Sequence, residues 1–228
     1  MSMIYADKIR VSSDGRIILD DLSISIERGD WLCVAGDTGS GKSSLLNVLL
    51  GLAKPESGSI SLGDGVKSAS IAFMPQSSDT DQVFPQTVHQ IVSSGMLGGK
   101  RFFARLSKSE KEKAQEVMNL LDIADLSERR FADLSGGQKQ KVLIARAICS
   151  AKEMIVLDEP DNGLDKTSVD NLLLTLKHLN LAGITIITTC SDVSLYIMYA
   201  SHFLLLDSTP PYWGTASDMV RNGFIKGV

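Results

Sequence analysis

The segment Gly36-Asp37-Thr38-Gly39-Ser40-Gly41-Lys42-Ser43 constrains the fold of this chain more than any other. A short apolar run, Trp31 to Ala35, precedes it, and Lys42 to Leu50 has the character of a helix. Glycines between a strand and a helix let backbone N–H groups converge on phosphate oxygens, and the helix dipole adds to the attraction. A glycine turn without a ligand is the alternative, but the strand and helix on either side favour a phosphate-binding loop. In such a loop Lys42 neutralises the β- and γ-phosphates and Ser43 binds Mg²⁺.

A pair of carboxylates follows a second apolar run. Met154 to Leu157 predicts a buried strand, and Asp158 and Glu159 come directly after it. Since α/β sheets place ligand chemistry at the carboxyl ends of parallel strands, we expect Asp158 to hold Mg²⁺. Glu159 points elsewhere and can polarise a water molecule for in-line attack. A solvated acidic pair is the alternative, which the phosphate-binding loop disfavours.

A third feature, Leu134-Ser135-Gly136-Gly137-Gln138, opens a predicted helix. A serine and two glycines at a helix N-terminus can bind an anion. They can also be an ordinary cap followed by a permissive turn. Because the chain already has one phosphate-binding loop, a second anion site here requires a second phosphate.

Composition limits the class of protein. The 228 residues are 43% hydrophobic and 22% charged, enough for one well-packed domain, and the net charge of −4 argues against nucleic-acid binding. Cys33, Cys149 and Cys190 lack metal-ligand and disulfide spacing. We therefore expect Cys33 and Cys149 to be buried, in a reducing compartment. No signal peptide is expected, and Ile184 to Leu206 fits strand, helix and strand better than a membrane span.

Periodicity predicts an α/β fold with a mainly parallel sheet, an antiparallel N-terminal edge and a helical insert from about Ser77 to Leu134. Strands are expected at Ile4–Val11, Leu22–Ile26, Trp31–Ala35, Ser59–Leu62, Ser70–Met74, Met154–Leu157 and Ile184–Thr188. Helices are expected at Lys42–Leu50, Val83–Gly95, Lys108–Leu121, Gly136–Cys149 and Lys166–Leu179. Asp14-Gly15 is a turn signal between the first two strands.

Leu134 to Gln138 resembles, in all five residues, the signature of the ATP-binding-cassette (ABC) ATPases, and the resemblance covers essentially the whole chain. It implies one nucleotide-binding domain over residues 1–228, a RecA-like P-loop NTPase with a helical subdomain at roughly 77–134. It implies ATP and Mg²⁺ as cofactors. It further implies that two domains pair head to tail, so that Ser135, Gly136, Gly137 and Gln138 complete the partner's ATP site.

Other positions take their roles only through this resemblance. Gln76 resembles the glutamine that contacts Mg²⁺ and the attacking water and senses the membrane subunits. Asn162-Gly163-Leu164-Asp165 resembles the loop that crosses the dimer interface, and Arg146 lies in a stretch typical of the helix after the signature. The resemblance therefore implies that residues 36–44, which end at Ser44, surround the nucleotide. The implied metal ligands are Ser43, Gln76 and Asp158, and Glu159 and Gln76 are catalytic.

The chain departs from the family after the strand Ile184–Thr188. The family has a histidine there, usually followed by aspartate, that contacts the γ-phosphate. Matching Asp192 to that aspartate places Ser191 at the histidine position, and a slip of one residue would place Cys190 there. A serine side chain is shorter than a histidine side chain and, unlike histidine, cannot become cationic. Because losing one such group commonly costs about 2.7–4 kcal/mol, we expect Ser191 to support only slow hydrolysis of well-bound ATP.

A second departure concerns the base of the nucleotide. The family usually has an aromatic residue near the N-terminus that stacks on adenine, and counting back from Leu19 places Ser13 there. Tyr5 is the only aromatic residue nearby, and we expect it to face the sheet. Base stacking is worth roughly 1–3 kcal/mol in nucleic-acid binders. The sequence therefore predicts weaker nucleotide affinity or weaker base selectivity.

The insert is too short for the long coiled coil of chromosome-associated ABC proteins, and the chain has one cassette where translation-associated members have two. The resemblance therefore favours a transporter ATPase, cytoplasmic and peripheral on the membrane, with a second cassette and integral permease subunits as partners. Phe84 to Val88 and the region of Gly95 resemble importers of zinc or manganese. A catalytically impaired regulatory cassette and a nucleotide-dependent scaffold outside transport are the alternatives.

Overall fold

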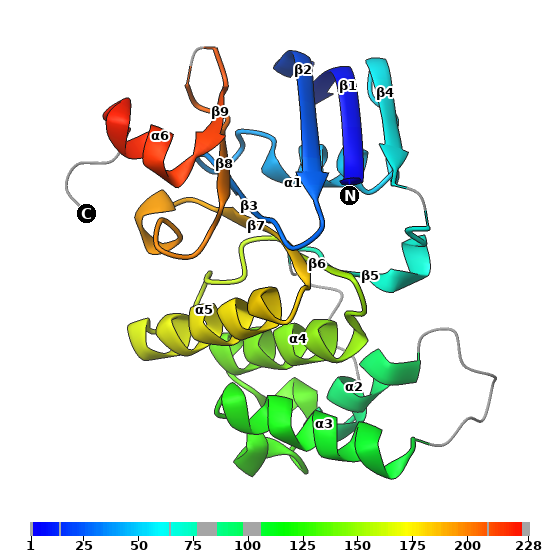
Figure 1. Cartoon of the computed structure of the whole chain (residues 1–228). Helices are drawn as coiled ribbons and strands as arrows, with labels where there is room; N and C mark the ends of the chain where they lie inside the picture. The colour runs from blue at the N-terminus through cyan, green and yellow to red at the C-terminus, as the bar shows by residue number, and fades with distance from the viewer. Residues whose placement is uncertain are drawn as a thin grey trace. The chain divides into compact units, whose positions relative to one another are not determined.

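A computed structural model describes residues 2–13, 15–63, 65–76, 86–97, 106–208 and 210–224. The chain forms two compact units (Figure 1). Unit 1 contains residues 1–68 and 180–228, and unit 2 contains residues 69–179. The chain therefore leaves unit 1 after Ser68 and returns to it at Asn180. The proposed helical insert at 77–134 lies within unit 2, and residues 77–85 and 98–105 of it are outside the described residues.

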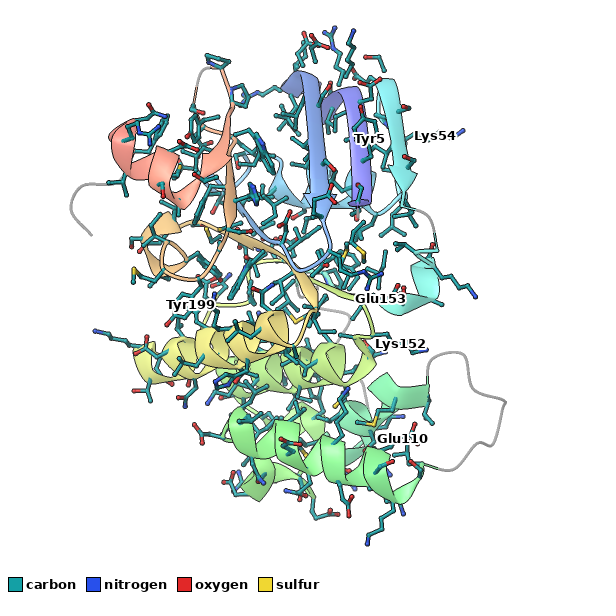
Figure 2. The ribbon with its side chains drawn as sticks, viewed as in Figure 1. Tyr5, Lys54, Glu110, Lys152, Glu153 and Tyr199 are labelled. Carbon is teal, nitrogen blue, oxygen red and sulfur yellow. The ribbon has the colours of Figure 1, made fainter. Side chains whose placement is uncertain are left out.

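Unit 1 begins with an antiparallel sheet, as the sequence predicts. Its strand order is β2 (Arg16–Glu27), β1 (Ser2–Ser13) and β4 (Ser57–Leu62). Ile4 and Ala6 are fully buried, whereas Tyr5 between them is 47% exposed and lies on the other face of the sheet (Figure 2). β2 begins at Arg16, well before the predicted Leu22, because its backbone pairs with β1 as far as the Ser13–Arg16 pair. Gly15 has a φ of 74°, as a tight turn requires, and Asp14 lies outside the described residues.

The second sheet of unit 1 carries the phosphate-binding segment. β3 (Trp31–Ala35) is fully buried and lies between the parallel strands β7 (Thr185–Cys190) and β8 (His202–Leu205). β9 (Tyr212–Thr215), which the sequence did not predict, pairs antiparallel with β8. Helices α1 (Lys42–Leu49) and α6 (Ala216–Arg221) belong to the same unit. The indole N–H of Trp31 donates to Thr188 Oγ1 at 3.0 Å, which satisfies the polar atom of the largest buried side chain in this sheet.

Unit 2 combines a parallel strand pair with helices. β5 (Ile71–Met74) pairs with β6 (Met154–Leu157), and the helices are α2 (Val88–Ser94), α3 (Lys108–Leu120), α4 (Gly136–Ser150) and α5 (Lys166–Leu181). The predicted helices are thus confirmed to within a few residues, except at the start of α2. That helix begins after Thr87, whose hydroxyl accepts a hydrogen bond from Gln90 N, and the predicted start at residues 83–85 is outside the described residues.

Two local contacts fix the helices of unit 2. Ser107 and Glu110 form a reciprocal capping box that starts α3. Gly95 ends α2, and a Cβ on it would lie 2.3 Å from the carbonyl oxygen of Arg146 on α4. Only a residue without a side chain allows this approach. None of the helices in the described ranges is long and apolar enough to cross a bilayer.

Candidate functional site

The segment 36–43 forms the turn between β3 and α1, as the sequence predicts. Gly39 and Gly41 have φ values of 85° and 92°, a backbone conformation that glycine adopts without strain. Gly41 is the N-cap of α1, and no side chain of the described residues caps that helix. The N–H groups of its first turn therefore point out of the helix end, where a phosphate group would be favoured.

Lys42 and Asp207 fix the shape of this loop. The Lys42 ammonium, which is buried, donates to the carbonyl oxygens of Gly36 at 2.7 Å and Asp37 at 3.0 Å. The backbone N–H of Asp37 donates to the carboxylate of Asp207, which follows β8. At the start of the loop, Gly36 N donates to Cys190 O at 3.2 Å. The loop is therefore held from both neighbouring strands, and the cation of Lys42 is already at its centre.

In unit 2 the two predicted carboxylates follow β6. Asp158 is buried, and its backbone N–H donates to Met74 O at 3.0 Å, so the ends of β5 and β6 are tied together. Gln76, two residues after β5, donates from Nε2 to Glu159 Oε2 at 2.8 Å. The structure thus brings the side chains of Gln76 and Glu159 together. This hydrogen bond fixes one oxygen of the Glu159 carboxylate, as expected of a carboxylate that positions a water molecule.

Gln140 on α4 holds the backbone at Glu159. Its side-chain amide is almost fully buried and donates to the carbonyl oxygens of Glu159 at 3.2 Å and Pro160 at 3.4 Å. Glu159 itself has a φ of 47°, which is uncommon and costly for a residue with a side chain. Gln140 therefore stabilises a strained backbone at the residue whose carboxylate is the candidate general base.

The signature residues start α4. Ser135 is its N-cap and forms a reciprocal capping box with Gln138, through Gln138 N to Ser135 Oγ at 3.3 Å and Ser135 N to Gln138 Oε1 at 3.0 Å. Gly136 and Gly137 carry no side chain over the N–H groups of the first turn. A Cβ on Gly137 would lie 2.8 Å from the carbonyl oxygen of Gly163. The structure has the cap that the sequence allowed as an alternative to an anion site, and Gly137 lies against the backbone of Gly163 in the loop 162–165.

Asp165 ends that loop and caps α5. Its carboxylate accepts hydrogen bonds from the backbone N–H of Ser168 at 2.9 Å and from the Ser168 hydroxyl at 2.8 Å. These bonds, the backbone one first, hold the pKa of Asp165 below its ordinary value of 3.8. The loop 162–165 is therefore anchored at its C-terminal end to α5.

The end of β7 separates the two candidates for the histidine position. Cys190 is the last residue of the strand, is fully buried, and has its Sγ 3.2 Å from Cys33 Sγ. Ser191 is the first residue beyond the strand and is exposed. Asp192 accepts a hydrogen bond from Ser194 N and caps the following turn. The side chain available to a ligand at this end of the strand is therefore that of Ser191.

Each unit offers side-chain oxygens of the kind that Mg²⁺ binds. In unit 2, Asp158 and Gln76 offer carboxylate and amide oxygens, the hard donors that Mg²⁺ prefers, and in unit 1 the start of α1 offers the hydroxyl of Ser43. Within the described ranges no three His, Cys, Asp or Glu side chains cluster as a metal site. A magnesium ion held by one or two protein groups together with nucleotide phosphates is consistent with this small set.

Sequence reasoning missed Gln140 and Asp207. Gln140 lies between Gly137 and Ile144 on the buried face of α4, so a polar residue within an apolar helix stripe was the available signal. Asp207 follows the apolar strand β8 as Asp158 follows β6, so its position was visible but its bond to the loop was not.

Comparison with known proteins agrees with this arrangement. The family model for the ABC transporter matches residues 19–162, more than half of the chain. The zinc uptake system ATP-binding protein ZurA of Listeria innocua is 31% identical over 224 residues, which are 95% of this chain and 87% of that protein. The manganese transport system ATP-binding protein MntB of Listeria monocytogenes is 33% identical over 195 residues, 84% of this chain and 81% of that one. A solved structure described as a metal-chelate type ABC transporter in an inward-facing conformation has 30% identity and a TM-score of 0.80, covering 96% of this chain and 86% of its own.

Proposed function

The chain belongs to the ABC transporter family as an ATP-binding subunit, and we propose that it drives the import of a metal ion through membrane subunits. The support is the similarity to the zinc and manganese transport proteins and to the metal-chelate type transporter. The sequence resemblance to metal importers around α2 points the same way, although Phe84 and Pro85 lie outside the described residues. The class of solute is therefore a metal ion, free or chelated.

The observation that carries the ATPase role is the hydrogen bond from Gln76 to Glu159. In the proposed reaction the triphosphate lies on the N–H groups of residues 39–44, and Lys42 leaves its loop carbonyls to pair with phosphate oxygens. Mg²⁺, when bound, neutralises charge on the phosphates. Glu159 accepts the proton of the attacking water, while Gln76 holds the other side of the carboxylate. Glu159→Gln should keep ATP binding and lower hydrolysis to a small residual rate, and unchanged hydrolysis in this variant would contradict the assignment.

We propose that hydrolysis is slow because Ser191 stands at the histidine position. Ser191 is exposed at the end of β7, so its short hydroxyl is the group offered to the γ-phosphate. Replacing a positioned donor by a weaker one is expected to lower the rate by about 10²–10³. Single-turnover hydrolysis in the assembled complex should rise with Ser191→His. A rate typical of the family that Ser191→Ala leaves unchanged would refute the proposal.

We propose that two cassettes pair head to tail around two ATP molecules. The glycine N–H groups at the start of α4 form an anion site that the chain's own phosphate-binding loop does not need. Addition of ATP to the Glu159→Gln variant should therefore convert the monomer into a dimer, as measured by light scattering. Gly136→Asp, which puts a carboxylate where the partner's phosphate would lie, should prevent this dimer while leaving one ATP bound per monomer. A dimer that forms equally well in Gly136→Asp would contradict the head-to-tail arrangement.

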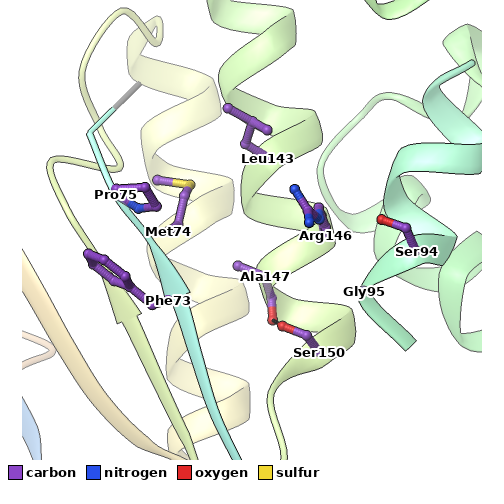
Figure 3. Close-up of a pocket in the computed structure, with 9 residues that line it drawn as sticks. All are labelled: Phe73, Met74, Pro75, Ser94, Gly95, Leu143, Arg146, Ala147 and Ser150. Atoms are coloured by element: carbon purple, nitrogen blue, oxygen red, sulfur yellow. Dashed lines mark hydrogen bonds between the residues drawn. The ribbon is translucent and has the colours of Figure 1, made fainter. Parts of the chain in front are cut away.

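We propose that a cytoplasmic segment of the permease docks in a hollow of unit 2. This hollow, of about 430 Å³, lies between the end of β5 with Pro75, the end of α2 at Gly95, and α4 (Figure 3). Leu143 and Ala147 contribute apolar side chains to its lining, and the exposed Arg146 contributes a positive charge. Since Pro75 adjoins Gln76, a segment seated there would contact the loop that carries a catalytic group. Arg146→Glu should abolish co-purification with a multi-span membrane chain and keep ATP binding.

Transport itself is tested in cells. A strain lacking this chain should accumulate less zinc or manganese under metal limitation, measured by mass spectrometry. The wild-type chain should restore the metal content and Glu159→Gln should not. The absence of the histidine also favours a second candidate, a regulatory cassette for which ATP only holds a dimer with a different, active cassette. In that case Glu159→Gln would restore metal content as well as the wild type does.

A further inference from the structure

Unit 1 has a hollow beside the phosphate-binding loop that the phosphates do not explain. It has a volume of about 500 Å³. Its walls come from three places in the sequence: the start of β2, the loop itself and the residues after β8. They are Arg16, Ile17, Ile18, Gly39, Ser40, Leu206 and Asp207. The hollow therefore lies between the loop, the start of β2 and the residues that follow β8.

The hollow joins the loop through tight contacts. Ile18 packs directly over Gly41, since a Cβ on Gly41 would lie 2.1 Å from Ile18 Cδ1. Ser40 contributes a hydroxyl oxygen that is buried and has no hydrogen-bond partner within the described residues. A polar atom buried in this way normally has a partner, so its position at the wall points to a ligand. A nucleotide whose phosphates lie on the loop would thus pass Ser40 and Ile18 on its way into the hollow.

The charges of the hollow match an uncharged ring better than a phosphate. Asp207 places a carboxylate at the wall, and Arg16 is the one basic residue of the lining. The two charges cancel, and a carboxylate repels phosphate oxygens. Leu206 is buried, and Ile17 exposes 54% of its surface at the start of β2. A lining that combines leucine and isoleucine side chains with polar groups suits a heteroaromatic ring, which has apolar faces and polar edges.

Arg16 has the shape that such a ring requires. It is the first residue of β2, so its backbone is fixed by pairing with Ser13, and its side chain is exposed. Within the described residues its guanidinium has no hydrogen-bond or ion-pair partner. A guanidinium is planar and weakly hydrated, and it stacks on aromatic faces. Arg16 is therefore a planar cation on the lining of the hollow that no side chain of the described residues engages.

We propose that, in this chain, Arg16 stacks on the base of the nucleotide in this hollow and so replaces the aromatic residue that the family has at the position of Ser13. The inference rests on the proposed ATP binding. Ile17 and Ile18, which also line the hollow, would contact the ring and the sugar. Since every purine has the same π-face, stacking of this kind favours adenine and guanine about equally.

The test separates the base from the phosphates. Binding of ATP, GTP and inorganic tripolyphosphate to the full chain is measured by titration calorimetry. Arg16→Ala should weaken ATP and GTP by about three- to tenfold, the effect of a cation–π contact at a partly exposed site, and leave tripolyphosphate unchanged. Arg16→Trp should strengthen ATP binding, again without effect on tripolyphosphate. Arg129→Ala, an exposed arginine in unit 2, is the control for loss of one positive charge.

The outcomes are distinct. If Arg16→Ala weakens tripolyphosphate as much as ATP, Arg16 contacts phosphate and the proposal is wrong. If neither Arg16→Ala nor Arg16→Trp changes ATP affinity, the base does not lie on Arg16. A wild-type chain that binds neither ATP nor tripolyphosphate would instead refute the proposed function. Selective loss of nucleoside triphosphate affinity in Arg16→Ala is the result that supports the base site.

Discussion

Replacing Gln140 by methionine should slow ATP hydrolysis without weakening ATP binding. Methionine has nearly the same length as glutamine and tolerates a core site, so the change removes the two N–H donors and leaves no large cavity. Gln140 contacts the carbonyl oxygens of Glu159 and Pro160 and belongs to unit 2, whereas the phosphate-binding loop belongs to unit 1. Binding and hydrolysis should therefore respond separately.

The expected loss of stability follows from the two hydrogen bonds. Each is worth about 0.5–1.5 kcal/mol net. At 3.2 and 3.4 Å both are long, and Glu159 O keeps a second donor, Asn162 N at 3.2 Å. Only Pro160 O is left without the donor that Gln140 supplied. The free energy of unfolding should thus fall by about 1–2 kcal/mol, measured by urea denaturation.

The effect on rate comes from the strained backbone of Glu159. A side-chain-bearing residue at a φ of 47° carries a cost of about 1–2 kcal/mol, similar to what Gln140 contributes. Without Gln140 the backbone can relax and move the carboxylate away from Gln76. A misplacement of about 1 Å can cost about 10²-fold in rate. Single-turnover hydrolysis should therefore fall by about 10- to 100-fold while the Kd for ATP stays constant.

A double-mutant cycle with Glu159→Gln decides whether Gln140 acts through Glu159. If it does, Gln140→Met has no further effect on the residual rate in the Glu159→Gln background. Gln115→Met is the matched control, since Gln115 is exposed on α3 and makes one side-chain bond, to Asn119 at 3.3 Å. A wild-type rate in Gln140→Met, with the expected loss of stability, would show that Gln140 only supports the fold and would refute this reasoning.

Three other predictions concern the fold. The pKa of Asp165 is held below its ordinary 3.8 by hydrogen bonds from Ser168, so its stabilising effect is present above that pH and is lost as pH falls through the lower pKa of the folded state. Asp165→Asn should therefore flatten the acid limb of the stability curve, and an unchanged limb would contradict this. Burial raises the pKa of Cys149 to about 11, so this thiol should react slowly with iodoacetamide at pH 8 until urea unfolds the chain, as peptide mapping would show. Gly95→Ala forces a methyl group against the carbonyl oxygen of Arg146 and should lower stability by about 1–3 kcal/mol in urea, and a stability equal to wild type would refute the close contact.

Elements whose position depends on the local sequence pattern were predictable from the sequence. β3 and β6 are apolar runs followed by polar loops, and their predicted bounds match the structure. The phosphate-binding loop was predictable because its glycines are required by local backbone geometry. The antiparallel edge was also predicted, but β2 was shortened, because exposed residues such as Arg16 and Ile17 do not alternate clearly.

Contacts between distant residues were not predictable in the same way. Gln140 and Glu159 are 19 residues apart, and the bond between them depends on how α4 packs beside the end of β6. Asp37 and Asp207 are 170 residues apart, and their bond depends on the parallel pairing of β3 and β8. Periodicity reports which face of an element is buried, but it does not report which polar group on another element it meets.

The packing of β7 decides which residue stands at the histidine position, a choice between Cys190 and Ser191 that the alignment leaves open. A one-residue slip in sequence exchanges Cys190 and Ser191, and both are small polarisable or polar groups. In the structure Cys190 is paired in β7, buried, and in contact with Cys33 on β3, so its thiol is not available to a ligand. Moving it outward would require β7 to lose its end pairing with Ala35 and the bond from Gly36 N to Cys190 O. The group at the end of the strand is therefore the Ser191 hydroxyl, and Ser191→His places an imidazole there without disturbing the buried thiol pair.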